Sequence, residues 1–244
     1  MISLLISLPK RSPPGHSSSA LHKQIVQELG SRIVAGRYPA GESLPNEELL
    51  CAELQVSRTA LREAVKVLGA KGLLDSRPRI GTLIRPVKAW NMLDADILAW
   101  RCKHDQDQGE ELLRQLSEIR EIIEPNACLL AARNRTPAEL ADVESAYAAM
   151  AASENIQDWV KADLSFHVAV LAASRNQLLI PLSTVISSAL EMLLSFSARR
   201  ASNFKKALPD HGKVLAAIRA QDERGAFASM QKLLADTRAR LAQR

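Results

Sequence analysis

An aspartate and two histidines in the second half of the chain have the residue types and spacing that suit a divalent metal ion. Asp163 and His167 stand four residues apart, so a helix over this segment places both side chains on one face. A carboxylate and an imidazole at that spacing can chelate one ion. His211 opens a later predicted helix and can come alongside them. The alternative for each histidine is a hydrogen-bonded core or surface residue.

A second group of residues, in the first half of the chain, suits binding to a polyanion. Residues 56–74 read VSRTALREAVKVLGAKGLL, with polar residues at helical spacing on one side and small aliphatic residues on another. The start of this predicted helix carries Ser57 as its expected N-cap, followed by Arg58, Thr59 and Arg62. Phosphates and base edges are the groups that such a helix end contacts in DNA. The alternative for Arg62 is a solvated surface charge paired with Glu53 or Glu63.

The elements around this helix predict a winged helix-turn-helix. Residues 20–36 carry an apolar stripe at four-residue spacing, and a short helix is predicted over residues 46–54, with Leu49, Leu50 and Leu54 facing inward. The later segment LLDSRPRIGTLI contains two short β-prone runs around a turn, which predicts a β-hairpin. The turn region of this hairpin carries Arg77, Pro78, Arg79 and Gly81.

Charge and cysteine usage narrow the class of protein. Residues 1–86 carry 12 Lys and Arg against 7 Asp and Glu, whereas residues 87–244 carry 20 of each. This imbalance indicates a polyanion partner for the first third of the chain. The 3 cysteines are odd in number and far apart, which excludes a disulfide framework and fits a reducing cytoplasm. The apolar run at the start precedes its basic residues and is too short for a membrane anchor, so no membrane partner is expected.

The second half predicts an all-helical domain. Helices are expected over residues 110–133, 137–152, 156–173, 178–200, 208–220 and 224–241. One of them opens with Thr136 as N-cap and Glu139 three residues later, which is a capping box. The expected fold class is mainly α, with an N-terminal winged helix-turn-helix followed by an all-α effector-binding bundle of six to seven helices. The expected parts are a disordered arm over residues 1–18, a winged-helix DNA-binding domain over 19–86, a linker with a short helix over 87–108, and an effector-binding and dimerisation domain over 109–244.

The sequence resembles the GntR superfamily of bacterial transcription regulators. The resemblance rests on GESLPNEELLCAELQVSRTALREAVKVLGAKGLL and RPRIGTLI in the first half. In the second half, IREIIEPNACLLAA, ADLSFHVAVLAASRN and DHGKVLAAIRAQD resemble the FCD effector domain of the FadR-like subgroup. The resemblance implies a homodimer that binds a double-stranded DNA operator through Ser57, Arg58, Thr59, Arg62, Arg79 and Gly81. Members often carry an Arg where this chain has Glu48, which implies a different operator preference.

The resemblance also implies a metal site. In the family an Asp, a His four residues later and two further His residues are metal ligands. Asp163, His167 and His211 match the first three positions, and Leu233 stands at the fourth. The implied site therefore holds a divalent ion, zinc or nickel, with three protein ligands in place of four.

The predicted effector site draws on two helices. Arg120 lies in an apolar seam, and the corresponding Arg of the family commonly reaches the effector pocket, which implies a carboxylate clamp. Its alternative partner is Glu124, four residues on. Ser187 and Glu191 belong to a polar stripe at four-residue spacing, which either lines a pocket for a hydroxylated ligand or faces water.

Two classes of function follow from these residues. The segment WNMLDADILAW and the missing last His resemble regulators of sugar-acid catabolism, which implies a cytoplasmic repressor released by a small carboxylate such as the aldonate galactonate. The alternative is a metal-dependent enzyme of the two-His-one-carboxylate type. Such enzyme sites normally sit in β-rich folds, and the second half is helical, so we expect a DNA-binding regulator and not an enzyme.

Overall fold

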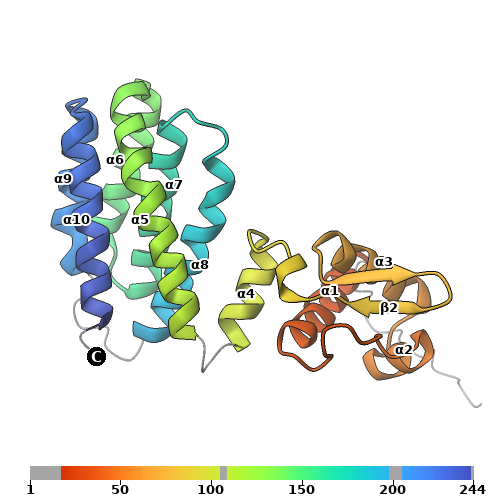
Figure 1. The fold of residues 1–244 in the computed structure, drawn as a ribbon. Helices are drawn as coiled ribbons and strands as arrows, with labels where there is room; N and C mark the ends of the chain where they lie inside the picture. Colours follow the sequence, from red (N-terminus) through yellow and green to blue (C-terminus); the bar gives the residue numbers. More distant parts are fainter. Residues whose placement is uncertain (1–17, 105–108, 198–204, 243–244) are drawn as a thin grey trace, which may run out of the picture. The chain divides into compact units, whose positions relative to one another are not determined.

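The computed structural model describes residues 18–104, 109–197 and 205–242, and the chain divides into two units between Trp90 and Asn91. The expected disordered arm lies outside the described residues up to residue 17. The first unit contains α1 (Ser18–Val34), α2 (Glu47–Leu54), α3 (Arg58–Ala70), β1 (Leu74–Arg77), β2 (Gly81–Ile84) and the short 3-10 helix η1 (Val87–Ala89). Figure 1 shows these elements with their labels.

The first unit is a winged helix-turn-helix. The apolar stripe of α1 is buried at Ile25, Leu29 and Ile33, and α1 packs against α3. The turn between α2 and α3 passes through Gln55 in the left-handed conformation, with φ of 54°. The strands β1 and β2 pair antiparallel from Leu74 opposite Ile84 to Arg77 opposite Gly81. This pairing confirms the predicted hairpin, which forms the wing.

The short helix α2 corrects one expectation about the core. Leu50 is buried, but its neighbour Leu49 is 61% exposed, so the prediction that Leu49 faces inward was wrong. A helix of 8 residues has room for a narrow buried stripe, and adjacent residues point about 100° apart around its axis. Leu50 occupies the buried side, which turns Leu49 to the outside.

The second unit is an all-helical bundle, as the sequence predicted. It contains α4 (Ala95–His104), α5 (Gly109–Asn134), α6 (Pro137–Ala152), α7 (Ile156–Ala173), the 3-10 helix η2 (Ile180–Leu182), α8 (Ser183–Ser197), α9 (Leu208–Arg219) and α10 (Glu223–Ala242). The long helices α5 and α10 run side by side (Figure 1), and α7 packs against α5, α6 and α8. Phe166 and Met230 are fully buried in its main apolar core.

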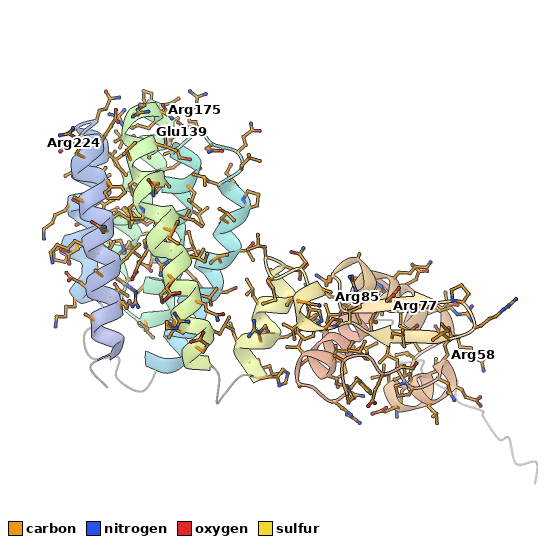
Figure 2. The ribbon with its side chains drawn as sticks, viewed as in Figure 1. Arg58, Arg77, Arg85, Glu139, Arg175 and Arg224 are labelled. Carbon is orange, nitrogen blue, oxygen red and sulfur yellow. The ribbon has the colours of Figure 1, made fainter. Side chains whose placement is uncertain are left out.

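Two of these helices begin at other residues than the sequence predicted. The short helix expected within residues 87–108 begins at Ala95, because the Asp94 side chain accepts hydrogen bonds from the first turn, from Asp96 N at 3.0 Å and from Ile97 N at 3.3 Å. The helix expected over residues 178–200 is split into η2 and α8. In the turn before η2, Arg175 has φ of 57° and lies 3.8 Å from Glu139 (Figure 2).

The described helices were compared with the length and hydropathy that a membrane span requires. None of them is both long and apolar enough to cross a membrane.

Candidate functional site

A hollow of about 620 Å³ lies between α2, α3 and the wing of the first unit. The residues that line it include Glu47, Arg62, Lys66, Arg77, Gly81 and Thr82. Arg77 stands on the wing and Arg58 at the start of α3 (Figure 2). The helix α3 and the wing therefore present basic side chains around one concave surface, as expected for a DNA-binding face.

The predicted DNA-contacting residues are all exposed, and two of them, Arg62 and Gly81, line this hollow. Ser57 accepts a hydrogen bond from Ala60 N at 3.2 Å, which confirms it as the N-cap of α3. Arg58 and Thr59 are exposed on the first turn that Ser57 caps. Arg79 and Gly81 shape the tip of the wing with φ of 64° and 108°. An arginine at positive φ is uncommon, and here it lies in the tight turn that joins β1 to β2.

Arg62 has a partner that the sequence did not predict. Its Nε donates to Glu47 Oε1 at 2.8 Å and its Nη2 donates to Glu47 Oε2 at 3.0 Å. The expected alternatives are engaged elsewhere, because Glu53 pairs with Arg32 and Arg37 and Glu63 pairs with Lys66. The two members of the pair stand 15 positions apart, so no local spacing signals it.

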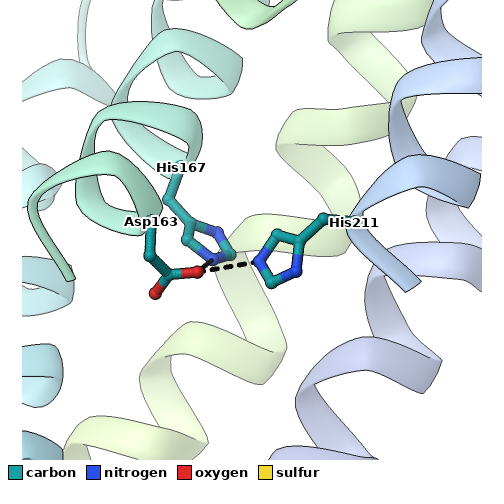
Figure 3. A group of neighbouring side chains, drawn as sticks. All are labelled: Asp163, His167 and His211. Atoms are coloured by element: carbon teal, nitrogen blue, oxygen red, sulfur yellow. Dashed lines mark ion pairs between the residues drawn. The ribbon is translucent and has the colours of Figure 1, made fainter. Parts of the chain in front are cut away.

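The second unit brings together the three predicted metal-ligating residues. Asp163 and His167 project from α7 and His211 from α9, and all three are at least nine-tenths buried (Figure 3). Asp163 Oδ1 lies 2.9 Å from His211 Nε2 and 3.7 Å from His167 Nε2. Tetrahedral donors at metal distances stand roughly 3.4 Å apart. The three donor atoms lie within 4.8 Å of one another, so they fit one divalent ion.

The two imidazole rings are oriented by neighbours outside this triad. His211 Nδ1 lies 2.9 Å from the carbonyl oxygen of Ala207, which leaves Nε2 facing Asp163. His167 Nδ1 lies 2.5 Å from Glu124 Oε2, although the angle at these two atoms does not make a hydrogen bond. Ligating imidazoles usually have such a carbonyl or carboxylate beside the second ring nitrogen. Both rings therefore direct Nε2 toward the shared position.

The helix α5 contributes an arginine and a glutamate to the same buried cluster. Arg120 Nε donates to Glu124 Oε1 at 2.5 Å, and the two residues are 4% and 2% exposed. Arg120 Nη2 also lies 3.3 Å from His167 Nε2, a contact that is a hydrogen bond only while that nitrogen is unprotonated. Arg120 therefore pairs with Glu124, the alternative partner considered from the sequence. We name the five side chains of Arg120, Glu124, Asp163, His167 and His211 the charged cluster.

Burial and charge shift the pKa values within the charged cluster in opposite directions. Burial alone would raise the pKa of Glu124, but Arg120 and His167 outweigh it and hold the pKa at about 2. Burial alone would lower the pKa of His167, but Glu124 and Asp163 raise it to about 9. His167 and His211 likewise lower the pKa of Asp163 against the effect of burial. Without a metal, the neighbouring charges therefore favour ionised carboxylates and a protonated His167 ring, a form in which Arg120 Nη2 cannot donate to His167 Nε2.

The remaining predicted residues have different surroundings. Leu233 is 1% exposed and packs in the apolar core with Ala226 and Met230, so it fills space and offers no ligand atom. The hydroxyl of Ser187 donates to the carbonyl oxygen of Ser183 at 2.9 Å. No contact between the described side chains joins Ser187 to Arg120. The side chain of Glu191 lies outside the described part of the chain.

Comparison with protein families identifies both units. Residues 21–84 match the model described as bacterial regulatory proteins, gntR family. Residues 115–236 match the FCD domain. The first match covers the winged helix-turn-helix and the second covers the bundle with the charged cluster.

Individual relatives agree with these matches. The chain is 34% identical over 220 residues to the galactonate operon transcriptional repressor of Escherichia coli K12, covering 89% of this chain and 95% of the relative. It is also 34% identical over 213 residues to the uncharacterized HTH-type transcriptional regulator YieP of the same strain, covering 86% and 90% of the two chains. Among solved structures, a GntR protein of Streptococcus agalactiae superposes with a TM-score of 0.51 at 25% identity, covering 89% of this chain and 99% of that one. These relatives are transcription regulators and not enzymes, and the chain belongs to the GntR family of bacterial transcription regulators, with an FCD domain as its second unit.

Proposed function

We propose that the protein is a homodimeric repressor of sugar-acid catabolism genes, released from its operator by a small carboxylate of the aldonate class. The observation that carries this proposal is the charged cluster buried in a domain of the FCD type, together with likeness to a relative named for repression of the galactonate operon. A second unit that encloses a guanidinium, two carboxylates and two imidazoles has the chemistry to bind an anion or a cation.

The operator is read by the helix α3 and the wing of each protomer. A single winged helix makes few base contacts, so two copies on a short pseudo-palindrome are expected. Ser57, Arg58, Thr59 and Arg62 approach the DNA from α3, and Arg79 and Gly81 from the wing. If Arg62 reads a base edge, Arg62→Ala costs about 1–3 kcal/mol of operator binding. A gel-shift titration at fixed salt that gives unchanged affinity would contradict this assignment.

The effector acts by favouring one conformation of the second unit over another. A ligand shifts such an equilibrium only through its differential affinity for the two states. Galactonate offers one carboxylate to Arg120 and several hydroxyls to serines such as Ser187. Addition of galactonate to the protein–operator complex should therefore release the DNA, whereas a shift toward tighter binding would identify an activator. The neutral polyol galactitol is the matched control for the carboxylate.

In this proposal Arg120 binds the effector carboxylate while it remains paired with Glu124. Its Nε is held by Glu124 and its Nη2 also lies 3.3 Å from His167 Nε2, so the edge formed by Nη1 and Nη2 is the one that would meet a carboxylate. Arg120→Lys keeps the charge but loses the planar fork, so the galactonate concentration needed for release should rise while DNA affinity without effector stays the same. An unchanged response in this variant would exclude the arginine as the clamp.

The metal of this proposal is zinc or nickel, bound by Asp163, His167 and His211. When bound, the ion would supply a positive charge that attracts the carboxylate of an effector, and water or that carboxylate would complete its coordination. Calorimetric titration of the metal-free chain with zinc tests the site, and absence of binding with and without galactonate would reject it. Leu233→His should tighten zinc binding if that residue faces the same cavity, since it supplies a fourth ligand.

A further inference from the structure

The exposed ion pair between α2 and α3 leaves one edge of the Arg62 guanidinium available. A guanidinium carries five N–H bonds, and Glu47 accepts one from Nε and one from Nη2. The N–H bonds that remain belong to Nη1 and Nη2, on the end edge of the group. In the major groove a guanine presents O6 and N7 as two neighbouring acceptors. Two parallel N–H bonds of one guanidinium can donate to both of them.

The position of Glu47 is fixed by the start of α2. The Asn46 side chain accepts a hydrogen bond from Leu49 N at 2.9 Å, which caps the helix and makes Glu47 its first residue. The helices α2 and α3 pack against each other, with Leu50 and Leu61 buried at 2% and 1% exposure. The backbones that carry both members of the ion pair are therefore held in place by the core of the unit.

A carboxylate in this position has a cost for DNA binding in general. Glu47 lines the same hollow as Lys66 and Arg77, where basic side chains would attract phosphates. An acidic group there weakens attraction to any DNA, whatever its sequence. The side chains of Arg62 and Glu47 are 64% and 44% exposed, and ion pairs as exposed as this one contribute little to folding stability. General affinity does not explain the carboxylate, and its contribution to stability, from the exposed ion pair and from its place in the first turn of α2, is small.

We propose that Glu47 is a positioning residue for DNA recognition, whose carboxylate holds the Arg62 guanidinium with its end edge directed to a guanine. The inference rests on the proposed reading of a base by Arg62. Glu47 then lowers the affinity for DNA of unrelated sequence and raises the affinity for the operator, because the arginine is ordered before binding. Preorganised side chains lose less conformational freedom when a complex forms.

The test compares two duplexes of equal length at one salt concentration. The first is the sequence that the wild-type full-length chain enriches from a random library, and the second is the same composition in shuffled order. Glu47→Gln should bind the enriched duplex about three- to tenfold more weakly, since the arginine must now be ordered on binding. The same variant should bind the shuffled duplex more tightly, because a negative charge beside the phosphates is gone.

The control is Glu42→Gln, which removes the same charge from the loop before α2. Glu42 is exposed and makes no hydrogen bond to Arg62 among the described contacts. This variant should bind both duplexes more tightly by the same factor. Glu47→Asp supplies the complementary case, because it keeps the charge and shortens the reach. It should weaken binding to the enriched duplex without tightening binding to the shuffled one.

The outcomes separate this inference from the function on which it rests. Equal tightening on both duplexes by Glu47→Gln means that Glu47 is only a repulsive charge, and equal weakening means that it only supports the fold; either overturns the proposal. In an Arg62→Ala background, Glu47→Gln should cause no further loss of discrimination. If the wild-type chain enriches no sequence, or Arg62→Ala retains full discrimination, the proposed operator reading itself fails.

Discussion

Replacement of Arg120 by methionine tests whether the guanidinium is the counter-ion of the buried Glu124 carboxylate. Arg120 and Glu124 are 4% and 2% exposed, so the variant leaves a carboxylate in the core without its closest partner. Breaking a buried pair in this way costs about 3–5 kcal/mol. His167 still lies beside Glu124, so we expect the lower end, about 3 kcal/mol. For a domain of this size, that corresponds to a fall in Tm of roughly 6–12 °C.

The double variant distinguishes loss of an ion pair from loss of packing. Arg120→Met together with Glu124→Met removes both charges and keeps long apolar side chains in their place. Replacing a whole buried pair by apolar residues is often neutral or stabilising, so the double variant should recover most of the loss. Urea unfolding followed by circular dichroism, in the presence of a chelator, gives the free energies for the double-mutant cycle.

A matched control lies on the same helix. Arg114 pairs with Glu111 and Glu118 in exposed contacts, and its side chain is 47% exposed. Arg114→Met should cost less than about 1 kcal/mol. The reasoning fails if Arg120→Met is as mild as Arg114→Met, or if the costs of Arg120→Met and Glu124→Met simply add in the double variant.

Three further changes probe the metal site, a helix cap and a glycine turn. Glu124→Gln should weaken zinc binding about 10- to 100-fold, because it removes the carboxylate beside the His167 imidazole of the proposed metal site; calorimetry that finds equal affinity would contradict this. Thr136→Ala should cost about 1 kcal/mol of unfolding free energy by breaking the capping box, measurable by urea titration. Gly72→Ala should cost more than Gly36→Ala, since both glycines have positive φ but only at Gly72 would the new Cβ meet a carbonyl oxygen, that of Ala89 at 2.4 Å. Equal melting temperatures for these two glycine variants would rule out the close approach.

Features encoded by neighbouring residues were predictable from the sequence. The N-cap at Ser57 and the capping box at Thr136 depend on side chains within three residues of the helix start, and both are present in the structure. The apolar stripe of α1 and the hairpin after Gly72 follow from residue periodicity in the same way. The spacing of Asp163 and His167 predicted that both side chains lie on one face of a helix, and the structure brings them together.

Features that depend on packing between helices were not predictable in this way. Arg62 pairs with Glu47 on another helix and not with Glu53 or Glu63, because the helix-turn-helix geometry brings α2 against α3. Glu124 was recognised only as a partner for Arg120, four residues away, and not as a neighbour of His167. That neighbour relation arises where α5 packs against α7, 43 positions apart along the chain from Glu124 to His167.

The charge of the buried cluster gives a reason to expect cooperation between metal and effector. Ligating imidazoles must be neutral, so the fixed charges in the metal-bound state are two carboxylates, the Arg120 guanidinium and the divalent ion. Their sum leaves one uncompensated positive charge, which is unfavourable in a site that is nine-tenths buried or more. A monocarboxylate effector cancels that charge, and a neutral polyol does not. Zinc titrations should therefore give tighter binding with galactonate present than with galactitol present. Equal zinc affinities in the presence of the two compounds would show that charge compensation does not couple the sites.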